Sequence, residues 1–214
     1  MILYCAADRY YFNLYFDLWE KQTSKIYPEL RRHIALHNPT DEAKQKCIDH
    51  MVDFNDITEW FPENPTRSHF YLLRWLYLPY LYQQNILETQ INCLPVKEQE
   101  LPNKIKAQWR VQRQKPHTTT GLGGVSAAIF TPEAAKKVVD QAVKMLKNPP
   151  ENDHEMNMWQ INNLEQELVL CEHQIKDKFG DETELPPHAY WITARTAQAW
   201  SHDKKLEALK RFCK

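Results

Sequence analysis

The chain has 214 residues, of which 43% are hydrophobic, 12% aromatic and 26% charged. These values are typical of a soluble globular protein and predict a single α/β domain over residues 1–214. Lys and Arg number 27 against 28 Asp and Glu, a formal charge of -1, so the overall charge does not favour a nucleic-acid partner. No apolar run approaches the roughly 20 residues that a bilayer requires, which argues against a membrane span.

The cysteines and the N-terminus predict a cellular compartment. Five cysteines lie far apart, at positions 5, 47, 93, 171 and 213, and no two form a C-x-x-C pair. We therefore expect reduced thiols and neither a disulfide framework nor a zinc site. The first residues enter a strand-like pattern without a basic leader, so we expect no signal peptide and a cytoplasmic protein.

The N-terminal half alternates between strand and helix patterns. Residues 2–6 are the first expected strand, and an amphipathic helix follows with apolar positions Tyr11, Leu14, Tyr15, Leu18 and Trp19. A second strand is expected at 33–37, and a second helix begins after Thr40 with acids in its first turn. Such alternation predicts a mostly parallel sheet with helices on both faces.

An aromatic-rich segment leads to the expected central strand. Residues 69–82 are predicted as one helix that Pro79 ends or kinks. The following stretch, 85–96, is predicted as a buried strand in which Gln90 and Asn92 lie on the same side of a period-2 backbone. Because ligands bind at the carboxyl ends of strands in open α/β sheets, these two amides are candidate ligand contacts.

The C-terminal half predicts a mixed sheet. Residues 104–112 alternate in polarity, which indicates a strand with one wet face, antiparallel or near an edge. Three of the four glycines lie in the turn 121–124, which is either a tight hairpin or a floor for substrate; in the second case Gly123 and Gly124 lie on the acceptor side. Helices are expected after the Thr131 cap, from about 153, and over 199–213.

Small residues, a carboxylate and an aromatic ring follow one another at the end of the first strand, at Ala6, Ala7, Asp8 and Tyr11. A carboxylate at this position can accept the imide N–H of uracil, while the ring offers the base a stacking face. The alternative is structural, because Asp8 can cap the next helix and Tyr11 can be a core residue. The residues alone leave both interpretations open.

The stretch from Ile2 to Tyr11, with its Ala-Ala-Asp-x-x-Tyr pattern, resembles the opening of the family 8 glycosyltransferases, the class of glycogenin and the bacterial galactosyltransferases. The resemblance implies a GT-A-like fold and a UDP-sugar donor whose base contacts Ala6, Asp8 and Tyr11. In that fold a strand such as 85–96 ends in Asp-x-Asp and holds a metal, whereas this chain has Gln-Ile-Asn. Neutral amides hold hard cations weakly, so we expect Mn2+ or Mg2+ to be bound weakly or not at all.

Two further features resemble the family in the same order along the chain. Arg74 precedes Pro79 in an apolar segment, where the resemblance implies a phosphate contact, although a buried glutamate or backbone carbonyls would satisfy it equally well. Residues 152–157 resemble an acidic stretch near the acceptor, which implies catalytic roles for Asp153, Glu155 and Asn157. Without the resemblance, these acids are simply favoured by a helix dipole.

A late histidine is the last feature that the resemblance implies, on the diphosphate and followed by lysine. The candidates are His188, which we assign to the acceptor side, and His202, which is followed by Lys204. A lone histidine is more often structural or exposed than a ligand, and neither candidate carries the complete family motif.

These features predict a glycosyltransferase that moves a sugar from a UDP-sugar to a hydroxyl of a glycan, protein or nucleic acid, with retention as in family 8 and with weak or no metal dependence. One alternative is a catalytically silent GT-A-like domain that binds nucleotide sugars or a protein partner. The other is a viral-type glucosyltransferase that acts on modified nucleic-acid bases, with a local basic face at Arg110, Arg113, Lys115 and His117.

Overall fold

The computed structural model describes residues 1–102, 104–113, 127–152, 154–174, 189–193 and 201–213. The strands of these residues form one nine-stranded sheet in the order β3-β2-β1-β4-β7-β6-β8-β9-β5. The strands are β1 Ile2–Asp8, β2 Arg31–His37, β3 Asp53–Asp56, β4 Ile86–Gln90, β5 Cys93–Pro95, β6 Gln108–Arg113, β7 Ala127–Phe130, β8 Gln166–Gln174 and β9 Trp191–Thr193. The helices are α1 Arg9–Ile26, α2 Asp41–Asp49, η1 Thr58–Trp60, α3 Arg67–Phe70, α4 Leu73–Leu76, η2 Tyr80–Tyr82, α5 Pro132–Met145, α6 His154–Asn163 and α7 His202–Phe212.

The first part of the sheet is parallel and the remainder is mixed. β3, β2, β1 and β4 run parallel, while β7 pairs antiparallel with both β4 and β6. Parallel neighbours need crossover connections, and helices α1 and α2 supply the first two. The predicted mostly parallel, mixed α/β sheet is therefore confirmed, and the carboxyl ends of its four parallel strands lie at one edge.

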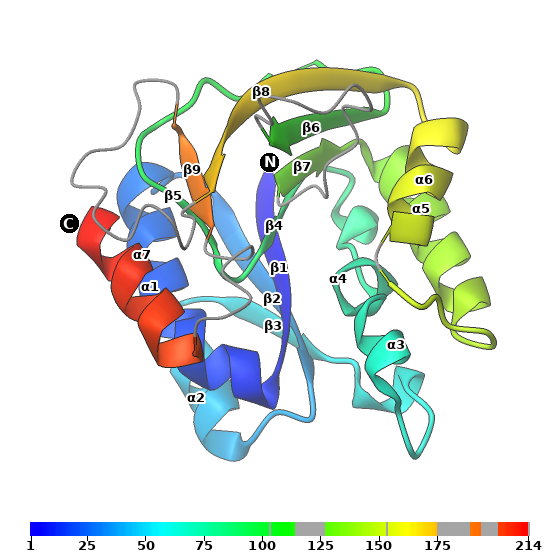
Figure 1. Cartoon of the computed structure of the whole chain (residues 1–214), viewed down its shortest axis with the longest axis horizontal. Coiled ribbons are helices and arrows are strands. Elements are labelled where there is room, and N and C mark those ends of the chain that lie inside the picture. Colours follow the sequence, from blue (N-terminus) through cyan, green and yellow to red (C-terminus); the bar gives the residue numbers. More distant parts are fainter. Residues whose placement is uncertain (103, 114–126, 153, 175–188, 194–200, 214) are drawn as a thin grey trace.

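Helices cover both faces of the sheet, as predicted (Figure 1). α1, α2 and α7 lie on one face, where Phe16 and Trp19 belong to a buried cluster beneath the sheet. α3 to α6 lie on the other face, where Trp75 and Phe130 belong to a second buried cluster. Strands of a sheet that is covered on both faces are hydrophobic along almost their whole length. β1 fits this pattern, because it is almost entirely buried.

The helix starts follow their capping residues. The side chains of Thr40 and Thr131 accept the backbone N–H groups of Ala43 and Ala134, both at 3.2 Å, which confirms the predicted caps of α2 and α5. The buried stripe of α1 differs partly from the prediction, because Phe12 belongs to it with Tyr15 and Trp19, whereas Tyr11 is only partly buried. The helix is therefore rotated slightly from the predicted orientation.

Two predicted elements are interrupted. The segment 69–82 is not one helix: Tyr71 and Leu72 donate to carbonyls three residues back, and these tightened turns separate α3 from α4 well before Pro79. The predicted strand 85–96 is also two strands, since β4 ends at Gln90 and residues 91–92 form a turn. β5 does not continue beside β1. It pairs antiparallel with β9, at the end of the sheet opposite to β3.

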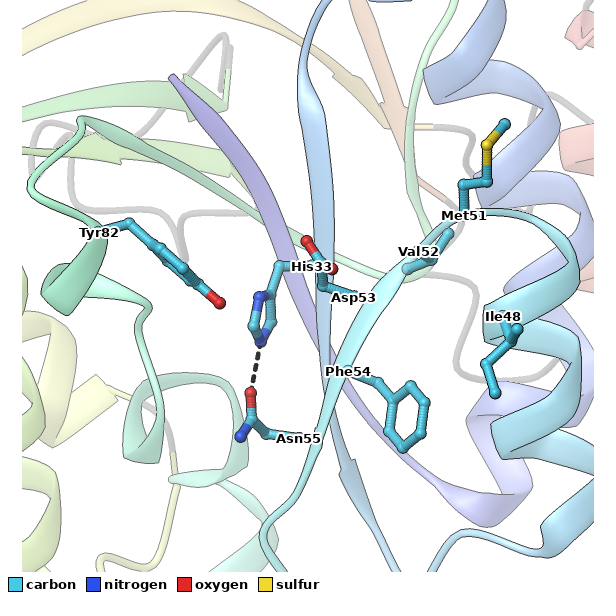
Figure 2. A pocket seen from close by; sticks show the side chains of 8 residues that line it. All are labelled: His33, Ile48, Met51, Val52, Asp53, Phe54, Asn55 and Tyr82. Carbon is cyan, nitrogen blue, oxygen red and sulfur yellow. Dashed lines mark hydrogen bonds between the residues drawn. The ribbon is translucent and has the colours of Figure 1, made fainter.

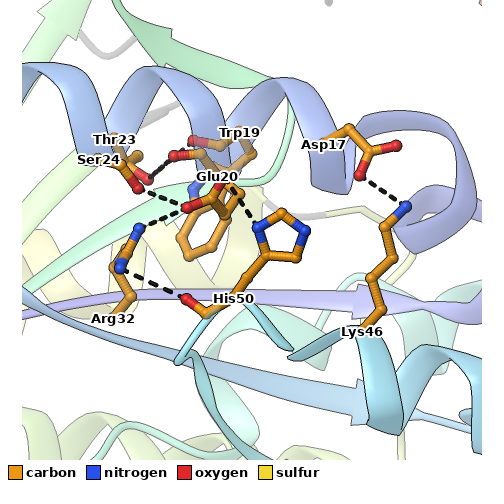
Figure 3. Close-up of polar contacts among 8 residues, drawn as sticks. All are labelled: Asp17, Trp19, Glu20, Thr23, Ser24, Arg32, Lys46 and His50. Atoms are coloured by element: carbon orange, nitrogen blue, oxygen red, sulfur yellow. Dashed lines mark hydrogen bonds and ion pairs between the residues drawn. The ribbon is translucent and has the colours of Figure 1, made fainter. Parts of the chain in front are cut away.

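A polar network joins α1, β2 and the end of α2 (Figure 3). The Glu20 carboxylate accepts from Arg32 Nη1 at 2.6 Å and Ser24 Oγ at 2.5 Å, and its other oxygen lies 3.3 Å from His50 Nδ1. The side chains of Glu20 and Arg32 are only 14% and 15% exposed, so this ion pair is better shielded from solvent than a surface pair. The network fixes β2 and α2 against α1, near the amino end of β2.

Cys5, Cys47, Cys93 and Cys213 are buried free thiols, as expected for the cysteines that the structure describes. Burial raises the pKa of Cys47 and Cys213 to about 12, so these thiols are protonated and unreactive at neutral pH. In the described part of the chain, the helices are too short or too polar to cross a bilayer.

Candidate functional site

The carboxyl ends of β1, β2 and β4 bring three polar side chains to one edge of the sheet. In the parallel register, Asp8 of β1 is the partner of His37 of β2, and Ala6 is the partner of Gln90 of β4. Ligands of open α/β sheets bind at this edge. We call Ala6, Asp8, His37 and Gln90, together with the residues that contact them, the carboxyl-edge site.

Asp8 has a structural role in this site. It is the N-cap of α1, and its Oδ1 accepts the backbone N–H of Tyr11 at 2.8 Å. The capping interpretation of the sequence is therefore correct. It does not compete with ligand binding, because a carboxylate has a second oxygen and the cap uses only Oδ1.

Tyr11 and His202 come together from opposite ends of the chain. α7 packs on α1, and the His202 ring lies edge-on to the rings of Tyr10 and Tyr11, at centroid distances of 5.2 and 5.4 Å. Within the described residues, His202 Nδ1 is a buried nitrogen without a hydrogen-bond partner. Of the two predicted late histidines, His202 is thus next to the first-strand motif, while His188 lies outside the described residues.

Lys204 follows in the first turn of α7, where its backbone N–H donates to Ser201 Oγ at 3.3 Å. Its side chain is exposed, on the helix that carries His202 to Tyr11. The cap at Ser201 therefore fixes the start of α7, the helix that carries both predicted phosphate-binding residues.

Arg74 has the buried glutamate partner that the sequence left as an alternative. Its Nε donates to Glu88 Oε1 at 2.7 Å, and Nη2 donates to Oε2 at 2.5 Å. Glu88 is fully buried and Arg74 is 8% exposed, so the pair is part of the core between α4 and β4. The phosphate contact of Arg74 stays a prediction, but the guanidinium is already engaged by a bidentate carboxylate.

Gln90 and Asn92 do not occupy equivalent positions. Gln90 ends β4 beside Ala6, whereas Asn92 lies in the turn before β5. The period-2 argument that placed both amides on one face therefore fails for Asn92, because asparagine here supports a turn instead of a strand. No group of three metal-ligating His, Cys, Asp or Glu side chains exists within the described ranges.

Glu155 and Asn157 of the predicted catalytic stretch lie in the first turns of α6. Met156 packs into the cluster of α4 and α5, Asn157 is buried, and the Glu155 carboxylate accepts the backbone N–H of Glu151 at 3.2 Å. Glu155 thus has the local, helix-start role that the sequence offered as its alternative. Asp153, Gly123 and Gly124 lie outside the described residues, so their predicted roles stay predictions, as does the catalytic role of Asn157.

The basic residues of the nucleic-acid alternative are only partly described. Arg110 and Arg113 lie on β6, in the middle of the sheet order, and Lys115 and His117 lie outside the described residues. Their predicted contact with nucleic acid stays a prediction.

His37 is the site residue that the sequence reasoning missed. Its ring is packed against Phe61 and Phe70 at centroid distances of 4.4 and 5.0 Å. Burial lowers the pKa of His37, and the carboxylates of Asp8 and Asp56 oppose that shift. The signal was available, since His37 is the last residue of the predicted second strand and Asp8 lies just after the predicted first strand.

The fold is similar to those of solved glycosyltransferases. The galactosyltransferase LgtC, solved with donor and acceptor sugar analogues, has a TM-score of 0.60 and 12% identity over 98% of this chain and 95% of its own. GlyE of Streptococcus pneumoniae TIGR4 has a TM-score of 0.60 and 12% identity, over 99% of this chain and 60% of its own. A glycosyltransferase involved in glycosylation of the major capsid of PBCV-1 has a TM-score of 0.55 and 7% identity, over 98% and 100%.

Sequence comparison gives no such likeness, since no protein-family model and no curated protein sequence matches the chain. At 7–12% identity the structural similarity establishes the fold alone. The predicted GT-A-like α/β architecture is confirmed at that level.

Proposed function

We infer that the chain is a glycosyltransferase that takes its sugar from a nucleotide-sugar donor, UDP-linked as in family 8, and transfers it to an acceptor hydroxyl. One observation carries this proposal: in a fold shared with solved glycosyltransferases, Asp8, Tyr11 and His202 converge at the carboxyl edge of the sheet. Donor identity, retention and membership of family 8 are parts of the proposal.

The donor base is held at Asp8. With Oδ1 fixed by the Tyr11 backbone N–H, Oδ2 is oriented by the same cap and accepts the imide N–H of uracil. The partly buried ring of Tyr11 stacks on the base. Ala6 has no side-chain atoms beyond Cβ and so leaves room for the nucleoside. Ala7 is buried and contributes packing beneath the base.

The diphosphate is held by the start of α7. Among the described residues, Nδ1 of His202 is buried without a hydrogen-bond partner, and Lys204 carries a positive charge two positions later in the same helix. A sugar–phosphate bond that breaks leaves negative charge on the diphosphate, and these two cationic or donating groups stabilise it. The acceptor oxygen forms the new bond to the sugar carbon, the diphosphate departs with the electrons of the broken bond, and the acceptor proton passes to the departing diphosphate.

The amides at the end of β4 do not fit a tightly held divalent cation. Gln90 and Asn92 offer neutral oxygens, and Asn92 lies in a turn, so they supply neither the charge nor the shared face of two carboxylates. We propose that they act as hydrogen-bond donors to the ribose and diphosphate, and we route no step through Mn2+ or Mg2+.

Turnover of sugar nucleotides tests the proposal. UDP-glucose, UDP-galactose, UDP-N-acetylglucosamine and their GDP counterparts should be incubated with the protein, with and without EDTA, and then with added manganese. We expect UDP release from at least one UDP-sugar, little changed by EDTA and strongly reduced in His202→Ala. Activity that disappears with EDTA and returns with manganese would contradict the proposal that Gln90 and Asn92 act without a tightly bound divalent cation.

The second candidate is a catalytically silent domain that binds nucleotide sugars. The amides at the usual position of two acids favour it. UDP binding without turnover of any sugar nucleotide, in the presence of varied acceptors, would support this candidate over the enzyme.

A further inference from the structure

One edge strand of the sheet borders a pocket that shares no residue with the carboxyl-edge site. β3 is one of the two terminal strands, and a pocket of about 520 Å³ opens beside it (Figure 2). Its size lies within the range of ligand-binding clefts. We call it the β3 pocket; the lining residues that matter here are His33, Ile48, Met51, Asp53, Asn55 and Tyr82.

One wall of the β3 pocket is polar and carries an aromatic ring. Tyr82 is 40% exposed, and the Arg31 guanidinium lies 4.4 Å from the centroid of its ring. Arg31 Nε also donates to Asp53 Oδ2, which orients the carboxylate beside the ring. Because a carboxylate accepts several hydrogen bonds, Asp53 can still receive a ligand hydroxyl.

The same wall carries the carboxamide of Asn55, whose orientation is fixed by a contact with His33. Asn55 Oδ1 lies 2.8 Å from Nε2 of the buried His33, and Figure 2 shows the amide nitrogen of Asn55 turned away from the histidine. The ring of His33 is itself held by stacking on Tyr77, at a centroid distance of 5.4 Å and an interplanar angle of 19°. The carboxamide donor is therefore positioned before any ligand arrives.

Exposed apolar side chains lie on the other side of β3, towards α2 (Figure 2). Six large hydrophobic side chains are exposed among the described residues, and three of them line this pocket: Ile48, Met51 and Tyr82. Met51 is 83% exposed and Ile48 is 58% exposed, so this side of the pocket is open to solvent. The exposed ring of Tyr82 suits an apolar face of a ligand, while Asp53 and Asn55 suit its hydroxyls or amides.

The charges along β3 decide between kinds of ligand. Asp53 is paired with Arg31, and Asp56 with Lys44 at 3.6 Å, so the surface has little net charge to attract a polyanion such as nucleic acid. An acid at each end of a four-residue edge strand also opposes the addition of another strand. The charges along β3 therefore favour a neutral ligand over a nucleic acid or an added peptide strand.

We propose that the β3 pocket binds a neutral oligosaccharide, with one sugar ring packed by its C–H face on Tyr82 and its hydroxyls bonded to Asp53 and Asn55. The proposal rests on the proposed glycosyltransferase function, to which it adds an anchoring site for a glycan acceptor. His33 lies four residues before His37 on β2, so the pocket is ~13 Å along the strand from the carboxyl edge. A glycan of several sugars can bind there while its end stays free.

The test is saturation-transfer difference NMR without any sugar nucleotide, using maltotetraose, cellotetraose and N-acetylchitotetraose at millimolar concentration. We expect the wild type to bind at least one tetrasaccharide, and Tyr82→Ala to weaken that binding at least about tenfold, as for a lost aromatic contact in a binding centre. Leu81→Ala is the matched control, because Leu81 is its exposed neighbour and does not line the pocket. It should bind like the wild type.

Two outcomes would overturn the proposal. One is that no tetrasaccharide binds, or that Tyr82→Ala binds as well as Leu81→Ala. The other is that an oligothymidylate or an extended valine–lysine peptide binds in a Tyr82-dependent manner while the sugars do not.

Release of UDP from UDP-sugars, measured in parallel, separates this failure from that of the proposed function. We expect Tyr82→Ala to retain wild-type hydrolysis, since the pocket shares no residue with the carboxyl-edge site. Tetrasaccharide binding by a protein that turns over no sugar nucleotide would overturn the proposed function and leave the pocket assignment intact.

Discussion

Replacing Arg74 by methionine should strongly destabilise the protein. The substitution leaves the fully buried Glu88 carboxylate without the two hydrogen bonds, at 2.7 and 2.5 Å, that compensate its desolvation. Breaking one side of a buried pair costs about 3–5 kcal/mol, a large part of the roughly 5–15 kcal/mol that stabilises a domain. For a chain of this size the expected fall in Tm is about 6–20 °C, measured by calorimetry and by urea unfolding.

A double variant tests the reasoning behind that magnitude. Arg74→Met combined with Glu88→Leu removes both charges, and such replacements by apolar residues are often neutral or stabilising. We therefore expect the double variant to be more stable than Arg74→Met alone. A single variant that loses less than about 1 kcal/mol, or a double variant that is no better, would refute the view that this pair is a core interaction.

Three smaller perturbations test other parts of the fold. Burial lowers the pKa of His33, so the native state stays neutral while the unfolded state takes up a proton below about pH 6.5; stability should therefore fall from pH 7 to pH 5, and less so in His33→Gln. Glu20→Gln should cost about 1–3 kcal/mol in urea unfolding, because the charge-assisted bond from Arg32 is lost; a change below 0.5 kcal/mol, roughly that of a surface site, would contradict it. Thr131→Ala should cost about 1 kcal/mol in urea unfolding by removing the side-chain cap of α5.

Local signals predicted the elements whose ends and buried faces are set by neighbouring residues. The cap at Thr131 predicted where α5 begins, and Val138 and Ala142 belong to the buried face of that helix. The end of β1 at Asp8 was placed two residues too early, and Asp8 itself was recognised as a strand-end residue with two possible roles. Caps and periodicity act within a few residues, so the sequence contains them in readable form.

Long-range pairing set the features that the sequence did not predict. β5 exists because Cys93 to Pro95 pair with β9, about a hundred residues later, and no local pattern marks that partner. The four-residue β3 is stabilised by its pairing with β2 and went unpredicted for the same reason. The approach of His202 to Tyr11 also depends on the packing of α7 on α1, so sequence order alone could not choose it over His188.

The substitution Asp8→Asn tests the central claim most directly. Asparagine caps helices as well as aspartate does, so the bond to the Tyr11 N–H and the free energy of unfolding should be retained. The second oxygen becomes an amide N–H, which opposes the imide N–H of uracil but matches the N3 acceptor of cytosine. Isothermal titration calorimetry should therefore find UDP binding weakened by roughly ten- to hundredfold, with CDP weakened less or strengthened. Equal UDP affinity in the wild type and in a folded Asp8→Asn variant would contradict a uridine site at Asp8.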